Sequence, residues 1–153
     1  TYPYISWRWR IRAVPVAADA RFEDSADSAA GVYLTYRRKF GLVPETVKFI
    51  WSEHLNIGSA FRRSGIGMPW TVVAGVGAAN QSVWHQVVFH VGDVYDQTFG
   101  GAGVTRPLGV AVLSDANNTN SFAAADYDDI VALREPPSGV TVSAVTNVLS
   151  LEN

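Results

Sequence analysis

Residues 4–13 have the sequence YISWRWRIRA, in which apolar and polar side chains alternate strictly. The side chains on the two sides are Ile5, Trp7, Trp9 and Ile11, and Ser6, Arg8, Arg10 and Arg12. An alternation with a period of two predicts a β-strand. Because two indoles on one side need a broad apolar surface opposite, we expect this strand to pack against a second sheet, with its arginines facing outward.

The composition predicts a single globular domain. A chain of 153 residues is long enough to bury roughly two thirds of its unfolded surface and leaves no room for a second domain. Hydrophobic residues make up 48% of the chain and charged residues only 17%, which argues against disorder. The net charge of −2 lacks the basic field that nonspecific nucleic-acid binding requires, so a nucleic-acid partner is not expected.

Other sequence features limit the class of protein further. Cysteine is absent, which excludes disulfides, thiolate catalysis and cysteine-based zinc sites. The longest charge-free run, residues 64–84, is interrupted by glycines and a proline, so no transmembrane segment is expected. Thr1 lies within a strand-like pattern and follows neither an initiator Met nor a signal peptide, so we expect a processed product with residues missing upstream.

Short strands separated by turn residues recur along the rest of the chain. The predicted strands are residues 32–39, 47–51, 70–76, 83–91, 108–113 and 124–133. Residues 53–69 are predicted to form a loop, and residues 93–99 two helical turns. The continuously apolar run 108–113 predicts a central strand that is covered on both faces.

These elements predict an all-β fold, a jelly-roll-like β-sandwich of two antiparallel sheets with little helix. The sandwich domain is expected to span residues 1–135. Residues 136–153 form an apolar C-terminal extension, in which residues 140–151 carry no charge. This tail must pair with the same sheet or pack on another chain, because an apolar β-rich segment left in water promotes aggregation.

Carboxylates near the end of the domain are candidate calcium ligands, because hard cations prefer oxygen. The candidate metal-binding residues are Asp115, Asp128 and Asp129. Their spacing does not match an EF-hand loop. In the alternative interpretation the Asx residues cap turns, and one of Asp128 and Asp129 points inward to an arginine or to backbone amides.

No catalytic residues are predicted. His85 and His90 are five residues apart on one predicted strand and therefore face opposite sides, which rules out a shared metal through that strand alone. The short Ser-containing segments around Ser59 and Ser64 lack the nucleophile-elbow pattern of acyl-transfer enzymes, which leaves a hydrolase only as an alternative built from residues scattered in the sequence.

Tryptophans and arginines are the candidate ligand-binding or partner-binding residues. Trp51, Trp70 and Trp84 are candidates because an exposed indole is a platform for the apolar face of a sugar. Arg8, Arg10 and Arg12 are candidates for holding an acidic partner. The alternative is that the tryptophans belong to the core and that acids on neighbouring strands balance the arginines.

Several motifs resemble an uncharacterised bacterial family of exported domains of unknown function, over residues 4–133. They are YISWRWR at 4–10, GVYLTY at 31–36, FG at 99–100, GVAVLSD at 109–115, NT at 118–119 and YDDI at 127–130. The resemblance implies a β-sandwich of the carbohydrate-binding-module type, strands preceding residue 1, and an aspartate that holds a structural calcium ion near the DDI motif. It also implies an exported protein of the periplasm or cell envelope.

The chain departs from the family pattern at polar positions. Ala26 replaces the first of two usual aspartates, Gly31 a usual arginine, and Asn117 a second aspartate. These losses favour a scaffold that packs against other proteins. We therefore expect a non-catalytic accessory subunit that docks on a larger envelope or membrane protein assembly. The alternative is a carbohydrate-binding module with a structural calcium ion, whose partner is a glycan.

Overall fold

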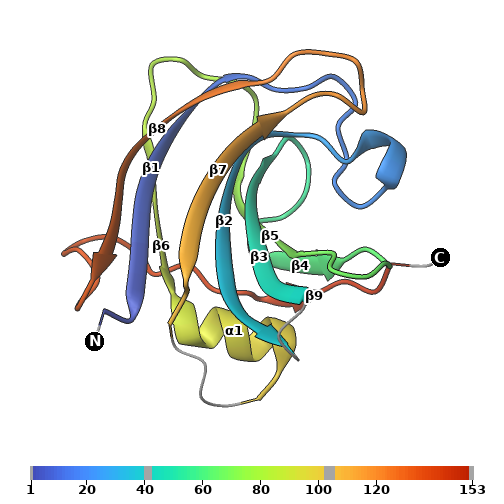
Figure 1. Ribbon diagram of the computed structural model, residues 1–153. Coiled ribbons are helices and arrows are strands. Elements are labelled where there is room, and N and C mark those ends of the chain that lie inside the picture. The colour runs from blue at the N-terminus through green and yellow to red at the C-terminus, as the bar shows by residue number, and fades with distance from the viewer. Residues whose placement is uncertain (1, 40–42, 102–105, 152–153) are drawn as a thin grey trace.

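The computed structural model describes residues 2–39, 43–101 and 106–151, which form two sheets and one α-helix (Figure 1). The strands are β1 (Tyr4–Ala13), β2 (Ser28–Lys39), β3 (Val43–Ser52), β4 (Ser59–Arg62), β5 (Trp70–Val76), β6 (His85–His90), β7 (Gly109–Asp115), β8 (Ala124–Leu133) and β9 (Asn147–Val148). The helix α1 spans Val91–Phe99, and a 3₁₀ turn spans Glu23–Ser25.

The strand β1 is the middle strand of a three-stranded antiparallel sheet with the order β6-β1-β8. Its bounds and its inward face are as predicted, because Trp7 and Trp9 are completely buried. The indole rings of Trp7 and Trp9 meet edge to face with their centroids 5.5 Å apart. The second sheet, which lies opposite, supplies the apolar surface that these two rings require.

The second sheet has six strands in the order β7-β2-β3-β5-β4-β9. It packs face to face on the first sheet, which confirms the prediction of an all-β sandwich with little helix. The large sheet is mixed rather than antiparallel, because β3 pairs with β5 in parallel and β4 pairs with β9 in parallel.

Aromatic rings from both sheets fill the space between them. The ring of Phe49, on β3, lies 5.3 Å from that of Trp7 and 4.6 Å from that of Phe89, on β6. At one end of the sandwich, α1 closes the core: the buried hydroxyl of Tyr36 donates a hydrogen bond of 3.0 Å to the carbonyl of Val91. The helix thus covers an opening that the sheets leave (Figure 1).

The outer face of the six-stranded sheet carries a second, smaller core. Its buried members are Ala20, Ile50, Leu55, Phe61 and Val73. Leu149 and Leu151 of the C-terminal tail pack against this cluster, and β9 pairs with β4. Earlier in the tail, the amide of Ser143 donates to the carbonyl of Val88 at 2.7 Å. The tail therefore pairs with its own domain, one of the two outcomes expected from its sequence.

Two elements differ from the prediction because contacts with residues distant in the sequence decide their structure. The segment 53–69 contains the short strand β4, whose Phe61 is buried in the second core. The prediction that residues 108–113 form a central strand was wrong: β7 is an edge strand with exposed residues on both faces. The apolar side chains of β7 are therefore not buried, and they form a surface that no other described strand covers.

The strand β8 contains a bulge at Asp129. Ser6 pairs with Val131 and Arg8 pairs with Asp128, so one extra residue interrupts the register between β1 and β8. Asp129 has φ of 48°, in the left-handed region. Because the bulge changes the alternation, Asp128 and Asp129 are both exposed on the outer side, which resolves the question of which one points inward: neither does.

No helix among the residues that the structure describes is long and apolar enough to cross a membrane.

Candidate partner-binding surface

The predicted arginine ladder lies on the outer face of the three-stranded sheet and is paired with acids of β8. Arg8 Nη2 lies 2.8 Å from Asp128 Oδ2, and Arg10 Nη2 lies 2.6 Å from Asp126 Oδ2. Arg12 Nη1 is 3.5 Å from the other oxygen of Asp126. The hydrogen bond from Arg10 lowers the pKa of Asp126. Cross-strand acids therefore balance the ladder, as in the alternative interpretation.

The three candidate tryptophans occupy three different environments. Trp51 is only 4% exposed, and its indole N–H donates to the carbonyl of Gly77 at 2.7 Å. Trp84 is half-buried, and the guanidinium groups of Arg8 and Arg10 lie 5.3 and 4.9 Å from its ring centroid. Trp70 is also half-buried, and it lines a cavity near α1.

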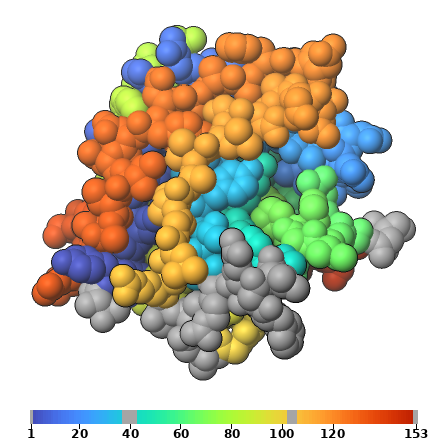
Figure 2. Space-filling view, in the orientation of Figure 1, coloured from blue at the N-terminus to red at the C-terminus, as the bar shows by residue number. Residues whose placement is uncertain are grey.

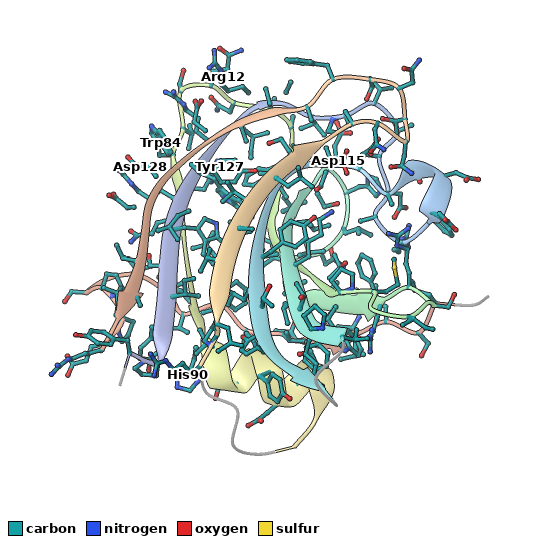
Figure 3. All side chains as sticks on the ribbon, in the orientation of Figure 1. Arg12, Trp84, His90, Asp115, Tyr127 and Asp128 are labelled. Atoms are coloured by element: carbon teal, nitrogen blue, oxygen red, sulfur yellow. The ribbon has the colours of Figure 1, made fainter. Side chains whose placement is uncertain are left out.

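The candidate metal ligands are not brought together. Asp115 ends β7, whereas Asp128 and Asp129 lie in the middle of β8 and pair with Arg8 (Figure 3). In the described part of the chain, no three Asp, Glu or His side chains are close enough to hold a metal ion. The loop after Asp115 is held instead by the buried carboxylate of Asp27, which accepts from the amides of Asn118 and Thr119.

Each histidine has a structural setting. His54 Nε2 lies 3.5 Å from Asp19 Oδ2, and the ring of His85 packs against that of Trp51 in a tilted arrangement, with the centroids 4.7 Å apart. Burial lowers the pKa of His85. His90 caps α1 by accepting the amide of Asp93. The three rings therefore belong to three separate local structures.

The apolar surface that stands out is the inward face of β7, which the opposite sheet does not cover. Val110 and Val112 pair with Leu34 and Val32 of β2, both completely buried, so all four point to the same side of the sheet. Val110 and Val112 are nevertheless 47% and 44% exposed. The cause is the width of the sheets: the three-stranded sheet ends at β8, so nothing described lies opposite β7.

A cleft of about 670 Å³ opens where this cover is missing, and we call it the β7–β8 cleft. Tyr4 and Ile5 of β1, Val110 of β7 and Ala132 of β8 are among the residues that line it. Figure 2 shows β1, in dark blue, at the bottom of the hollow between β7 and β8. The walls are predominantly apolar, as in a site that binds another apolar segment.

Tyr127 of β8 connects the two sheets. Its hydroxyl donates to the carbonyl of Leu113 at 2.9 Å and accepts from the amide of Gly31 at 3.1 Å, so it links β8 to β7 and β2 (Figure 3). Burial raises the pKa of Tyr127. Among the described residues, the β7–β8 cleft itself contains one cationic lining residue, Arg106, and Arg134 lies 5.3 Å from the ring centroid of Tyr2, another lining residue.

The sequence did not indicate this surface. The run of apolar residues in β7 was interpreted as buried, and the free edge becomes visible only once the sheet order is known. One feature of the sequence is consistent with an exposed strand, because the apolar residues Ile130 and Val131 directly follow two aspartates in β8. Both apolar side chains are exposed in the structure.

Comparisons with known proteins place the chain in a family without assigning a function. No curated protein and no solved structure matches it. A family model described as a protein of unknown function (DUF3047) matches residues 1–131, which include all but the last two residues of β8. That match confirms the expectation of an unknown-function family, and the chain belongs to the DUF3047 family.

Proposed function

We propose that the domain is a non-catalytic accessory module that docks on a larger protein assembly by accepting an extended strand in the β7–β8 cleft. The observation that carries this proposal is the exposure of Val110 and Val112, which face the interior side of the sandwich without an opposing layer. An exposed apolar sheet face of this kind is typical of a protein-interaction site.

The free edge of β8 supplies the backbone groups for such a strand. β8 pairs with β1 on one side, and its other side carries no strand among the described residues. A segment added beside β8 would extend the three-stranded sheet and lie opposite β7. Strand addition derives its affinity from main-chain hydrogen bonds and its specificity from alternate side chains, which here would cover Val110 and Val112.

The rim of the cleft defines the chemistry of the partner segment. Arg106 lines the cleft, and Arg134 lies beside Tyr2, which also lines it. The best occupant is therefore an extended segment with apolar residues at alternate positions and an acidic residue at one end. Apolar contacts provide the affinity, and the charges at the rim fix the direction of the strand.

Site-specific crosslinking tests this proposal. A photoreactive amino acid at position 112 should crosslink, in the native host, to an extended apolar segment of another polypeptide, identified by mass spectrometry. Val112→Lys should abolish co-purification of that same polypeptide, because a charge would be buried against the added strand. Val16 is 73% exposed on a loop, so Val16→Lys and a photoreactive residue at position 16 are matched controls.

Two results would contradict docking on a partner. One is a crosslink from position 112 to a segment of the same polypeptide. The other is unchanged co-purification in the Val112→Lys variant.

Location forms part of the proposal. The family resemblance supports an exported protein of the periplasm or envelope, and fractionation of the native host tests it. The C-terminal tail, for which the sequence also allowed packing on another chain, pairs with its own domain through β9 and Leu149. The proposed docking element is therefore the cleft rather than the tail.

A second candidate function, carbohydrate binding, is favoured by the surroundings of Trp70. Trp70 lines a cavity of about 380 Å³ together with Glu45, Arg62 and Phe99. An aromatic face beside a carboxylate and a guanidinium provides both a stacking platform and hydrogen-bonding groups for sugar hydroxyls.

A glycan array on the wild-type chain and on Trp70→Ala tests this second function. Binding that the substitution removes would support it, whereas no glycan bound by either chain would exclude it. A rise in melting temperature with added calcium would support the associated calcium site; an unchanged melting temperature would speak against that site.

A further inference from the structure

Lys48 is a buried cation in the middle of the six-stranded sheet. It lies on β3, directly between Tyr33 of β2 and Thr71 of β5 in the pairing register. All three side chains lie on the outer face of that sheet, opposite to the main core. Lys48 is only 9% exposed, because segments outside the sheet fold over it.

The Lys48 ammonium has no counter-ion at contact distance. Among the described side chains, none forms a hydrogen bond or an ion pair with its Nζ, which lies 5.5 Å from the ring centroid of Tyr33. The carboxylate of the nearby Asp27 is occupied by backbone amides of Asn118 and Thr119. Burying an ammonium group without a partner costs free energy, so a lysine in this setting is a candidate ligand-binding residue.

Lys48 borders a cavity of about 280 Å³, which we call the Lys48 pocket. Tyr33, Arg63 and Thr71 also line it. No hydrogen bond or ion pair within the described part of the chain engages the Tyr33 hydroxyl, the Thr71 hydroxyl or the Arg63 guanidinium. Four side chains that can donate hydrogen bonds, two of them cationic, therefore line one cavity, and none of the four has a hydrogen-bond acceptor among the described residues.

The charges around the pocket act on the pKa of Lys48 in both directions. Burial lowers the pKa of Lys48, and the positive charge of Arg63 lowers it further, while Asp115 and Asp27 act in the opposite direction. Burial, followed by the charge of Asp115, raises the pKa of Tyr33 to about 12, so its hydroxyl remains a donor at neutral pH.

We propose that the Lys48 pocket binds a small ligand through a carboxylate or phosphate group placed between Lys48 and Arg63. The carboxylates of Asp115 and Glu23 line the same pocket and would accept hydrogen bonds from a hydroxyl or ammonium group elsewhere on the ligand. This site is independent of the β7–β8 cleft.

Lysine-selective NMR tests the proposal directly, because the chain contains only two lysines, Lys39 and Lys48. Inorganic phosphate and succinate are the probes for the two anionic groups, and sodium chloride at matched ionic strength controls for screening. We expect a saturable shift of the Lys48 signal with at least one probe and none with chloride. Lys39 serves as the internal reference.

Substitutions separate binding from a general charge effect. Arg63→Gln removes one charge-assisted contact and should weaken the apparent affinity about ten-fold. Arg12→Gln removes a positive charge on the outer face of the three-stranded sheet and should leave the affinity unchanged.

The site assignment would be overturned by an absence of any saturable shift with both probes, by an equal shift with chloride, or by equal effects of the two arginine substitutions. Arg63 is half-buried and belongs to neither core, so its variant is expected to fold. The test therefore remains possible even if variants of Lys48 do not fold.

Discussion

Lys48 lowers the stability of the folded state through the same buried ammonium group that we propose binds a ligand. Its burial without a counter-ion costs free energy in the folded state, whereas the surrounding strand residues Val47, Phe49 and Ile50 are buried apolar side chains that favour folding. Residues retained at such a cost are typical of functional sites, where natural proteins accept lower stability.

We therefore predict that Lys48→Met raises the free energy of unfolding by about 1–2 kcal/mol at pH 7, because it replaces a desolvated ammonium with an apolar chain of similar length. Urea denaturation measures this change, with Arg134→Gln as the control for loss of an exposed charge. The same variant should no longer bind phosphate or succinate. A destabilised Lys48→Met variant would contradict the view that the ammonium is unfavourable in the folded state.

The stability gain of Lys48→Met should depend on pH in a defined direction. The pKa of Lys48 is lowered in the folded state from its ordinary value of 10.5. The penalty in the wild-type chain is therefore fully present below the folded pKa and disappears as the pH rises through 10.5. The difference between the two chains in urea should shrink between pH 7 and pH 10.5; a constant difference would contradict the lowered pKa.

At this scale the sequence predicts side-chain direction well and burial less well. Ile5, Trp7, Trp9 and Ile11 were assigned to the core by alternation alone, and all four are buried. Lys48 was not singled out, because its burial comes from loops distant in sequence. The alternation of residues around Lys48 does not reveal that those loops fold over it.

At the scale of the element, the bulge in β8 shows how one backbone conformation decides the direction of several side chains. Asp129 adopts φ of 48°, and as a result both aspartates of the DDI motif face the arginine ladder. An Asx residue tolerates this region far better than a β-branched residue does.

We predict that Asp129→Val destabilises the domain by about 1–2 kcal/mol through backbone strain. Asp129→Asn is the matched control, because it tolerates the left-handed conformation and loses only an exposed ion pair with Arg8, worth about 0–1 kcal/mol. Thermal or urea unfolding of both variants provides the comparison. Equal losses for the two substitutions would assign the effect to the ion pair instead of the bulge.

Element prediction succeeded where periodicity was strong and failed where neighbours decide the outcome. β1 and β8 have the predicted bounds, Tyr4–Ala13 and Ala124–Leu133. β4 was missed because a four-residue strand has too few positions for an alternation. β7 was predicted to be a central strand because an apolar run looks the same in the sequence whether or not another layer of the sandwich covers it.

At the scale of the whole molecule, the C-terminal tail completes the domain. Val145 is buried in the main core, and Leu149 and Leu151 pack on the second core. The amide of Leu149 also donates to the carbonyl of Ala60 at 2.7 Å. A boundary at residue 135, as expected from the sequence, would cut through these contacts.

We predict that removing residues 140–153 lowers the free energy of unfolding by about 3–6 kcal/mol, because three apolar side chains lose their partners. Melting temperature and binding of a hydrophobic dye report the loss. Leu149→Ala alone should produce a smaller decrease, since Val145 keeps its place. An unchanged melting temperature after truncation would show that the tail contributes nothing to the fold.

The all-β sandwich as a whole followed from the sequence, whereas the site did not. Strand number and alternation define two layers, but the order of strands within each sheet is set by long-range pairing. The uncovered Val110 and the buried Lys48 both depend on that order.

The central position of β1 has a consequence for biosynthesis. β1 pairs with β6 and with β8, and its contact between Arg8 and Asp128 spans 120 positions along the chain. The YISWRWRIRA segment is therefore translated before either of its two neighbours. Formation of the three-stranded sheet must wait until β8 has been translated, and a chaperone that shields tryptophan-rich nascent segments would raise the yield of native protein.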